Sequence, residues 1–244
     1  MDLEDRRQDI GEDYWWFAGK IELHSILLEL ICKKGRNIIL NVGCGTGEDL
    51  EIISKFGKTI AMDISKETLS KVVQSDTIQL IRGDAENLPF REDVFDIVLM
   101  LDVIEHLEND EKSVQQVFTV MNGGGHLIIS VPAIPLLFSG HDVGLGHLRR
   151  YTKKAFLNLV NNRFIIKRFT YWNTFLFPPI MVFRLMKKIV YIRRTNKTSD
   201  IWKLHPCLNK IFLSVLRLEN TLIKNNINLP FGVSLIGVFK KKVD

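Results

Sequence analysis

Short apolar segments alternate with helical patterns through the first 132 residues of the chain. The stretches NIILNVGCG, KTIAMDIS, IQLIRGD, FDIVLMLDV and HLIISVP are all rich in apolar and β-branched residues. Apolar residues recur with roughly helical spacing over 48–57, 66–74 and 110–121, and we expect the glycines at 123–125 to end the last of these helices. Continuous apolar strands that alternate with helices predict an α/β fold with a parallel sheet covered on both faces.

The pattern changes after residue 132. A helix is predicted over 152–162 with Thr152 as its N-cap, and strands are predicted over 164–172 and 233–241. Between these two strands the chain has two helical patterns instead of a turn. We therefore expect a seven-stranded sheet with a helical insertion between strands six and seven, long enough to have a function of its own. The second insertion helix keeps one face apolar, made of Leu208, Ile211, Phe212, Val215, Leu218 and Leu222.

Charge is divided unequally along the chain. Residues 1–132 contain 13 Lys+Arg and 24 Asp+Glu, a net charge of −11, whereas residues 133–244 contain 20 and 4, a net charge of +16. Such asymmetry predicts that the C-terminal part meets an anionic partner, such as a membrane surface, a phosphorylated substrate or nucleic acid. A solvated basic face is the simpler alternative.

The first insertion helix, around FLFPPIMVFRLMKKIVYIRR, is apolar but interrupted by prolines and basic residues. It is therefore not expected to span a membrane, which takes about 20 apolar residues. Its apolar face could lie on an anionic lipid surface, or could pack on the sheet or on the second insertion helix. The basic residues that would accompany lipid contact are Arg184, Lys187, Lys188, Arg193 and Arg194.

The cysteines and the N-terminus indicate a reducing compartment. Cys32, Cys44 and Cys207 are too few and too scattered for a disulfide framework, and none has the spacing of a metal site, so we expect no bound metal. The first residues are acidic and are not arranged as a signal peptide. We predict a cytoplasmic protein, with membrane association on the cytoplasmic face as the option that the first insertion helix leaves open.

The turn after the first predicted strand is rich in glycine. In NVGCGTGEDL the glycines are Gly43, Gly45 and Gly47, and Glu48 stands where the dinucleotide fingerprint G-x-G-x-x-G has its third glycine. A glutamate at the start of the following helix would repel a pyrophosphate, but it does not disturb a cofactor without phosphate. The turn therefore predicts a nucleoside cofactor and disfavours a nicotinamide dinucleotide.

The G-x-G-x-G spacing followed by an acidic residue resembles motif I of the class I S-adenosylmethionine-dependent methyltransferases, and further family signposts follow in order. Asp63, at the end of the second strand, stands where a family carboxylate binds the ribose hydroxyls, and Asp84 stands where the family recognises adenine. The resemblance implies S-adenosyl-L-methionine as cofactor, S-adenosyl-L-homocysteine as product, and a Rossmann-like, mostly parallel sheet whose last strand is antiparallel. The implied cofactor contacts are Asn41, Gly43, Cys44, Gly45, Gly47, Asp63, Ile64, Asp84, Ala85 and Leu101.

Asn41 departs from the family pattern. That position commonly carries Asp or Glu, which helps to hold the amino group of the cofactor. A neutral amide holds an ammonium group more weakly. We therefore expect weaker cofactor affinity, although binding need not be lost.

Three further segments extend the resemblance to nearly the whole chain. EDYWWFAGKIELHSILLEL, FSGHDVGLGHLRRYT and LPFGVSLIGVFKK are similar to the methyltransferase type 11 group with an N-terminal Trp-Trp-Phe segment. We interpret 1–244 as a single methyltransferase domain. Its parts are a cap helix (1–34), a cofactor-binding core (35–135), a substrate-side loop, helix and sixth strand (136–172), the helical insertion (173–232) and the last strand (233–244).

Two segments are predicted to contact an acceptor. The aromatic cluster before the cap helix could close over a sulfonium or an acceptor, because aromatic faces attract cations, or could serve as a hydrophobic staple. The stretch HDVGLGHLRRY concentrates titratable side chains on a glycine-containing loop, which favours a site over a connector, and its arginines can bind a phosphate or carboxylate. The candidate residues are Tyr14, Trp15, Trp16, His141, His147, Arg149, Arg150 and Tyr151.

The expected reaction needs little acid–base chemistry. Aligning an acceptor for in-line displacement can contribute as much as about 7 to 11 kcal/mol, and a hydroxyl acceptor would additionally need a base, for which His106 and His141 are the candidates. His106 could equally be structural. We expect a small or lipid-linked acceptor. The alternatives are an RNA methyltransferase, disfavoured because no Asn-Pro-Pro-Tyr run follows the fourth strand, and a non-catalytic S-adenosylmethionine-binding protein, favoured only by Asn41.

Overall fold

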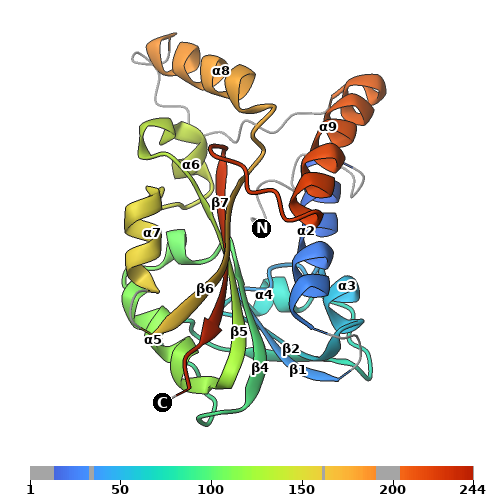
Figure 1. Ribbon diagram of the computed structural model, residues 1–244, viewed down its shortest axis with the longest axis vertical. Helices are drawn as coiled ribbons and strands as arrows, with labels where there is room; N and C mark the ends of the chain where they lie inside the picture. The colour runs from blue at the N-terminus through green and yellow to red at the C-terminus, as the bar shows by residue number, and fades with distance from the viewer. Residues whose placement is uncertain (1–13, 33–35, 161–162, 191–203, 244) are drawn as a thin grey trace.

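A seven-stranded sheet forms the centre of the molecule. The computed structural model describes residues 14–32, 36–160, 163–190 and 204–243 (Figure 1). The strands are β1 (Asn37–Val42), β2 (Gly57–Asp63), β3 (Ile78–Arg82), β4 (Phe95–Leu101), β5 (Met121–Pro132), β6 (Phe164–Trp172) and β7 (Ser234–Lys241).

The order of the strands is β3-β2-β1-β4-β5-β7-β6. Strands β1 to β5 pair in parallel, whereas β7 is antiparallel to both β5 and β6. The expected Rossmann-like, mostly parallel sheet with an antiparallel last strand is therefore confirmed. The carboxyl ends of β1, β2 and β4 meet at one edge of the sheet, which is where open α/β sheets hold ligands.

Helices cover both faces of the sheet, because neighbouring residues of each central strand point to opposite sides. In β1, Ile39 belongs to one apolar core and Leu40 to the other. The face packed with Leu40 is covered by α5 (Asp110–Val120) and α7 (Lys153–Leu159), whereas α2 (Trp15–Ile31), α3 (Leu50–Ser54) and α4 (Lys66–Leu69) lie on the opposite side (Figure 1).

Several predicted helix ends are wrong: the helix expected over 66–74 ends at Leu69, and the helix before β5 also ends earlier than expected. Helix α5 ends at Val120, and the glycines at 123–125 lie inside β5 instead of ending the helix. Strand β5 starts at Met121, which pairs with Phe95 before a register shift. Gly124 has φ +78, so the glycines allow an irregular start of a strand that then continues to Pro132.

The insertion between β6 and β7 contains α8 (Phe177–Val190) and α9 (Pro206–Lys224). Helix α9 packs along α2 at the right of Figure 1. The two helices approach closely at Gly19, where an added Cβ would lie 2.6 Å from Cδ1 of the buried Leu216. Asn220 ties them together by donating to the carbonyl of Gly19 at 2.8 Å. The insertion and the N-terminal helix therefore form one cap.

Helix α8 is the segment for which the sequence leaves contact with a lipid surface open. Among the described residues, no helix is both long enough and apolar enough to cross a membrane. Arg193 and Arg194 lie outside the described residues. Arg184 points inward, where its Nη1 lies 4.0 Å from a carboxylate oxygen of Asp142.

Candidate functional site

The glycine-rich turn follows β1 and requires glycine for two reasons. Gly43 has φ +67, a region that side chains rarely adopt. A Cβ at this position would also lie 2.5 Å from Cγ2 of Val103, in the loop after β4. The backbone of the turn therefore passes close to the end of the neighbouring strand and leaves its amide groups at the edge of the sheet.

Asp63 ends β2 beside this turn. Its Oδ2 accepts a hydrogen bond from the backbone N–H of Gly45 at 3.0 Å, and its Oδ1 accepts one from Ser65 at 2.9 Å. A carboxylate has about four acceptor positions, so two remain for hydroxyl groups of a ligand. The backbone of the glycine-rich turn therefore holds the side chain of Asp63 where the sequence predicts a contact with the ribose.

Asp84 follows β3 at the same edge. It accepts hydrogen bonds from the backbone N–H of Glu86 and the side chain of Asn87, both at 2.8 Å, and these two bonds lower the pKa of its carboxyl group. Ala85 is buried, whereas Ile64, after β2, is 64% exposed. The residues predicted to contact adenosine thus lie at an open part of the sheet edge, where the apolar side chain of Ile64 is exposed.

A cavity of about 400 Å³ adjoins the sheet edge. It is bounded by the cap helices, the ends of β1 and β4, and the loops that follow β4 and β5. Four of the predicted cofactor contacts line it: Asn41, Gly43, Cys44 and Leu101. The other six lie outside its lining, namely Gly45, Gly47, Asp63, Ile64, Asp84 and Ala85. Among its lining residues are Tyr14, Trp15, Trp16, Lys20, His24, Asn41, Gly43, Cys44, Leu101, Asp102, Glu105, His106, His141, His147, Arg150, Leu176, Ile180, Phe183 and Phe212.

The aromatic residues at the start of α2 form one wall of this cavity. Trp15 packs edge-on against Phe212 of α9, with ring centroids 5.3 Å apart, and Trp16 packs against Trp172 at 5.0 Å. These contacts hold the ring of Trp15 against the insertion and the ring of Trp16 against the end of β6. Tyr14, Trp15 and Trp16 thus line the cavity, and their contact with an acceptor stays a prediction.

Lys20 projects from the same helix toward the sheet. It forms an ion pair with Asp102, the residue after β4, which adopts φ +54. A non-glycine residue in this region is strained, and such residues concentrate at functional sites. The pair joins the cap to the sheet edge at the mouth of the glycine-rich turn. Neither residue was singled out from the sequence.

The loop after β5 is organised around a buried carboxylate. Asp142, in α6 (Gly140–Gly144), accepts hydrogen bonds from Nε of Arg150 at 2.7 Å and from the backbone N–H of Ser139 at 2.9 Å. Its Oδ1 also lies 3.1 Å from Nδ1 of His147. Burial raises the pKa of Asp142, but the hydrogen bond from His147 and the charges of Arg150 and Arg184 outweigh it and hold that pKa well below its usual range.

Arg149 and Tyr151 are not part of the cavity lining. Arg149 donates to the carbonyl of Leu107 at 3.0 Å and forms an ion pair with Asp110. Tyr151 is buried, and its hydroxyl donates to Asp110 at 2.7 Å. Both side chains tie the loop to the start of α5, so the structure gives them local partners, and their role in binding substrate stays a prediction.

The candidate bases line the cavity. Burial lowers the pKa of His106 to about 4, with a contribution from His147, and burial together with Arg184 lowers the pKa of His141 to about 3. Both rings are therefore neutral at pH 7 and can accept a hydrogen bond from an acceptor hydroxyl. Glu105, beside His106, is fully buried, and burial raises its pKa to about 7.

Several cavity residues were not predicted from the sequence. Lys20 and His24 lie four and eight residues after Trp16, so they share one face of the cap helix, and this spacing was a usable signal. His24 is held by Asp49, with Nδ1 3.0 Å from Oδ2. Glu105 gave no separate signal because its position in the sequence does not reveal that its side chain is buried.

Residues 40–129 match the family model described as a methyltransferase domain. An uncharacterized protein of Methanocaldococcus jannaschii is 36% identical over 121 residues, which are 49% of this chain and 56% of that protein. A Mycolicibacterium smegmatis protein provisionally named an S-adenosylmethionine-dependent methyltransferase is 26% identical over 140 residues, 56% of this chain and 52% of that protein. The chain thus spans about half the length of the curated relatives it matches.

Solved structures show the same fold over most of the chain. A Bacillus halodurans protein provisionally classed as a methyltransferase superposes with a TM-score of 0.61 and 18% identity, covering 91% of this chain and 99% of that one. The matched family segment contains the glycine-rich turn, Asp63, Asp84 and the residues after β4. The cap lies outside that segment.

Proposed function

Because residues 40–129 match a methyltransferase-domain family model, we propose that this chain is a class I S-adenosylmethionine-dependent methyltransferase and that it methylates a small or lipid-linked acceptor held beneath its helical cap. One observation carries the proposal. A single cavity is lined both by residues of the glycine-rich turn, Gly43 and Cys44, and by apolar side chains of the insertion, such as Ile180 and Phe212. A cofactor at the turn and an acceptor under the cap would therefore share one space.

The residues at the sheet edge fit the cofactor. The turn has no room for a side chain at Gly43, and Asp63 has acceptor positions left for two ribose hydroxyls. Asp84 and Ala85 follow β3 at the same edge of the sheet. When bound, S-adenosylmethionine supplies an electrophilic methyl group on a sulfonium. The protein contributes a binding site at the carboxyl ends of β1, β2 and β4.

The cap determines which acceptors fit. Its wall of Trp15, Trp16, Ile180 and Phe212 favours an apolar or aromatic part, because burying apolar surface stabilises the complex by about 25 cal/mol per Å². The opposite wall has imidazole and carboxylate groups that can orient a hydroxyl. We infer an amphipathic acceptor with a hydroxyl at its polar end.

His106 and His141 are proposed to orient this hydroxyl and to accept its proton. Their low pKa values keep both rings neutral at pH 7, so each has a lone pair available for the acceptor hydroxyl. The same low values make them weak bases, so positioning and exclusion of water contribute more than proton transfer. Lys20 and Trp16 of the cap line this space.

Calorimetric titration with S-adenosylmethionine and with S-adenosylhomocysteine tests the proposal, beside Asp63→Ala. We expect both ligands to bind the wild-type protein and to lose most of their affinity for the variant. A folded protein that binds neither would overturn the proposal. Transfer of labelled methyl groups to hydroxylated isoprenoid or aromatic compounds, with RNA as a separate arm, then distinguishes an acceptor of the proposed class from the RNA alternative. Binding without transfer in any arm would favour a non-catalytic role.

A further inference from the structure

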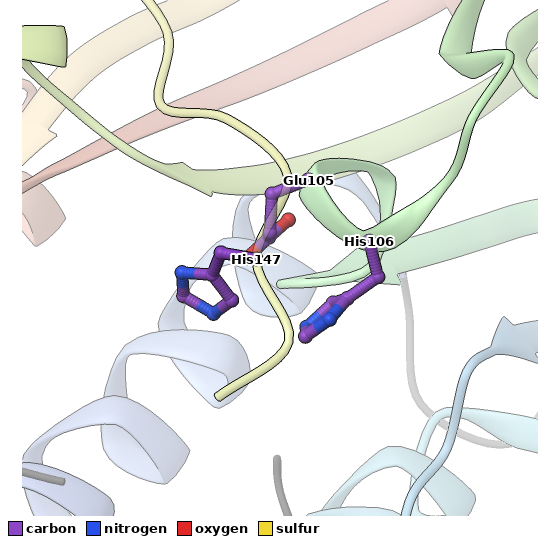
Figure 2. A group of neighbouring side chains, drawn as sticks. All are labelled: Glu105, His106 and His147. Carbon is purple, nitrogen blue, oxygen red and sulfur yellow. The ribbon is translucent and has the colours of Figure 1, made fainter. Parts of the chain in front are cut away.

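Three side chains with metal-ligating atoms meet at one wall of the cavity. Glu105 and His106 belong to a short 3-10 helix, η1 (Ile104–His106), and His147 comes from the loop after α6. One ligating atom of each residue lies within 4.8 Å of the other two (Figure 2). Because about 40 residues separate His106 from His147, the spacing in the sequence does not reveal the cluster, and we expected no metal from the sequence.

The two imidazoles are already oriented by partners behind them. Nδ1 of His147 lies 3.1 Å from Oδ1 of Asp142, and Nδ1 of His106 lies 3.2 Å from the carbonyl oxygen of Gly146. Both partners accept hydrogen bonds, so each Nδ1 carries the hydrogen and each Nε2 keeps a lone pair. Histidines that bind metals have this arrangement, in which a carboxylate or a carbonyl fixes the ring from the far side.

Glu105 is the unusual member of the cluster. Its side chain is completely buried, and neither carboxylate oxygen has a hydrogen-bond partner in another residue within the described part of the chain. Lys20 is close enough to interact with it electrostatically, but forms its ion pair with Asp102. A buried carboxylate without donors is costly, and most such groups in proteins have a hydrogen bond, a charge partner or a metal.

We propose that Glu105, His106 and His147 bind a divalent transition-metal ion of the zinc class. Two histidines and one glutamate are a ligand set of catalytic zinc sites and of other sites that keep open positions. Ligands at about 2.0–2.1 Å from one ion lie roughly 3.3 Å apart, so the three atoms, which lie within 4.8 Å of one another, must approach further when the ion binds. All three residues line the cavity, and the remaining coordination positions therefore face it.

The ion gives the cavity a chemistry beyond methyl transfer alone. While the ion is bound, Nε2 of His106 is a ligand, so of the two candidate bases only His141 can accept the proton of a hydroxyl group. An oxygen of a hydroxylated or carboxylated compound under the cap binds at the open position, where the ion lowers the pKa of a hydroxyl group and fixes its direction. The cations around the cavity each have a carboxylate nearby: Arg150 is paired with Asp142, Lys20 with Asp102, and Nη1 of Arg184 lies 4.0 Å from Asp142. The site exists whether or not the proposed methyl transfer occurs, because it depends only on residues of this chain.

Metal titration of the whole protein tests the site without any activity measurement. Zn²⁺ is followed by calorimetry, and Co²⁺ by the visible absorption that it gains with nitrogen ligands in a site of low coordination number. We expect one equivalent of each to bind. Glu105→Gln, His106→Asn and His147→Asn keep the approximate shape of each side chain and should each weaken binding by more than about 100-fold, whereas Asp142→Asn, behind the ligands, should weaken it by about 10-fold.

His141→Ala is the matched control, since His141 lines the same cavity but is not a member of the cluster. It should bind Zn²⁺ as the wild type does. Circular dichroism of each variant checks that it is folded. If a variant does not fold, the Co²⁺ spectrum of the wild-type protein is used in its place, because its bands report imidazole ligation. Absence of binding at millimolar metal, binding unchanged in Glu105→Gln, or equal loss in His141→Ala would each overturn the assignment.

Discussion

Asp142 accepts a hydrogen bond of 2.7 Å from Nε of Arg150, and both side chains are almost completely buried. This pair holds the loop that carries His141 and His147. Removing one partner of a buried pair leaves an uncompensated charge, which typically costs about 3 to 5 kcal/mol. We predict a loss of this size in the free energy of unfolding for Asp142→Ala, measured by urea denaturation.

The exposed pair of Glu51 and Lys55 provides the control. These side chains lie one helical turn apart and their charged atoms are 3.4 Å apart, but both are more than half exposed. Solvent screens such a pair, so Glu51→Gln should leave the free energy of unfolding unchanged within error. Equal effects of the two substitutions would show that burial does not determine the strength of the Asp142 pair.

Glu219 makes the stability of the insertion dependent on pH. It is buried in α9 and accepts hydrogen bonds from the backbone N–H groups of Thr174 at 3.0 Å and Phe175 at 2.7 Å, just before α8. Burial raises its pKa, although these hydrogen bonds oppose the shift. A carboxyl group whose pKa is raised on folding stabilises the fold most below its unfolded pKa of about 4.3, and that contribution is lost as pH rises through the folded value.

We therefore predict that the difference in unfolding free energy between wild type and Glu219→Gln depends on pH. The wild type should gain relative to the variant as pH falls from 7 toward about 4, because only Glu219 can take up the proton. Thermal unfolding at several pH values measures this difference. A constant difference over that range would contradict the raised pKa of Glu219.

Gly43 can be tested apart from the other glycines. Gly43→Ala places a Cβ 2.5 Å from Val103 at φ +67, and a positive φ alone costs about 1 to 2 kcal/mol for an L-residue. We expect lower stability and at least about 10-fold weaker binding of S-adenosylhomocysteine by calorimetry. Gly123→Ala is the control, because a Cβ there meets no atom closer than 3.8 Å. Unchanged binding by Gly43→Ala would remove the turn from the cofactor site.

The interface between α2 and α9 gives a further prediction. Gly19→Ala adds a methyl group 2.6 Å from Cδ1 of Leu216, and overpacking of this kind costs about 1 to 3 kcal/mol, more than the helix propensity gained. Leu216→Ala alone should cost about 2 to 5 kcal/mol. The double variant should be more stable than the sum of the two losses predicts. Strict additivity in chemical denaturation would mean that the two side chains do not compete for space.

The sheet was predictable from the sequence because each of its strands is locally encoded. Ile39 and Leu40 are both apolar since the sheet is covered on both faces, and the glycine turn is recognisable because its backbone tolerates nothing else at Gly43. The end of α5 was less predictable. Its glycines suggested a helix end, but tertiary pairing of Met121 with Phe95 draws the glycines into β5.

Only the wall of the cavity that the glycine-rich turn forms could be predicted from the sequence, and the reason is physical. Residues of the glycine turn lie close together in sequence, whereas the opposite wall depends on packing between α2 and α9, where Gly19 and Asn220 meet across 201 residues of sequence. The meeting of His106 with His147 likewise depends on how Asp142 and Arg150 fold the loop after β5. Local patterns do not encode such distances, so the sequence gives no sign of the role of Glu105.

Helix α8 provides the last prediction, which concerns membranes. Val182 and Met186 lie four residues apart on one face of the helix and are 52% and 61% exposed, whereas Arg184 is turned inward toward Asp142. An exposed apolar face on the strongly basic half of the chain favours peripheral binding to anionic lipid. We predict flotation with vesicles containing phosphatidylserine, little flotation with neutral vesicles, and weaker flotation of the Val182→Asp/Met186→Asp variant. The control is Val73→Asp, since Val73 is 83% exposed and lies after α4, outside the insertion. If the wild type stays unbound on anionic vesicles, the apolar face of α8 serves the protein itself, as part of the cap over the cavity.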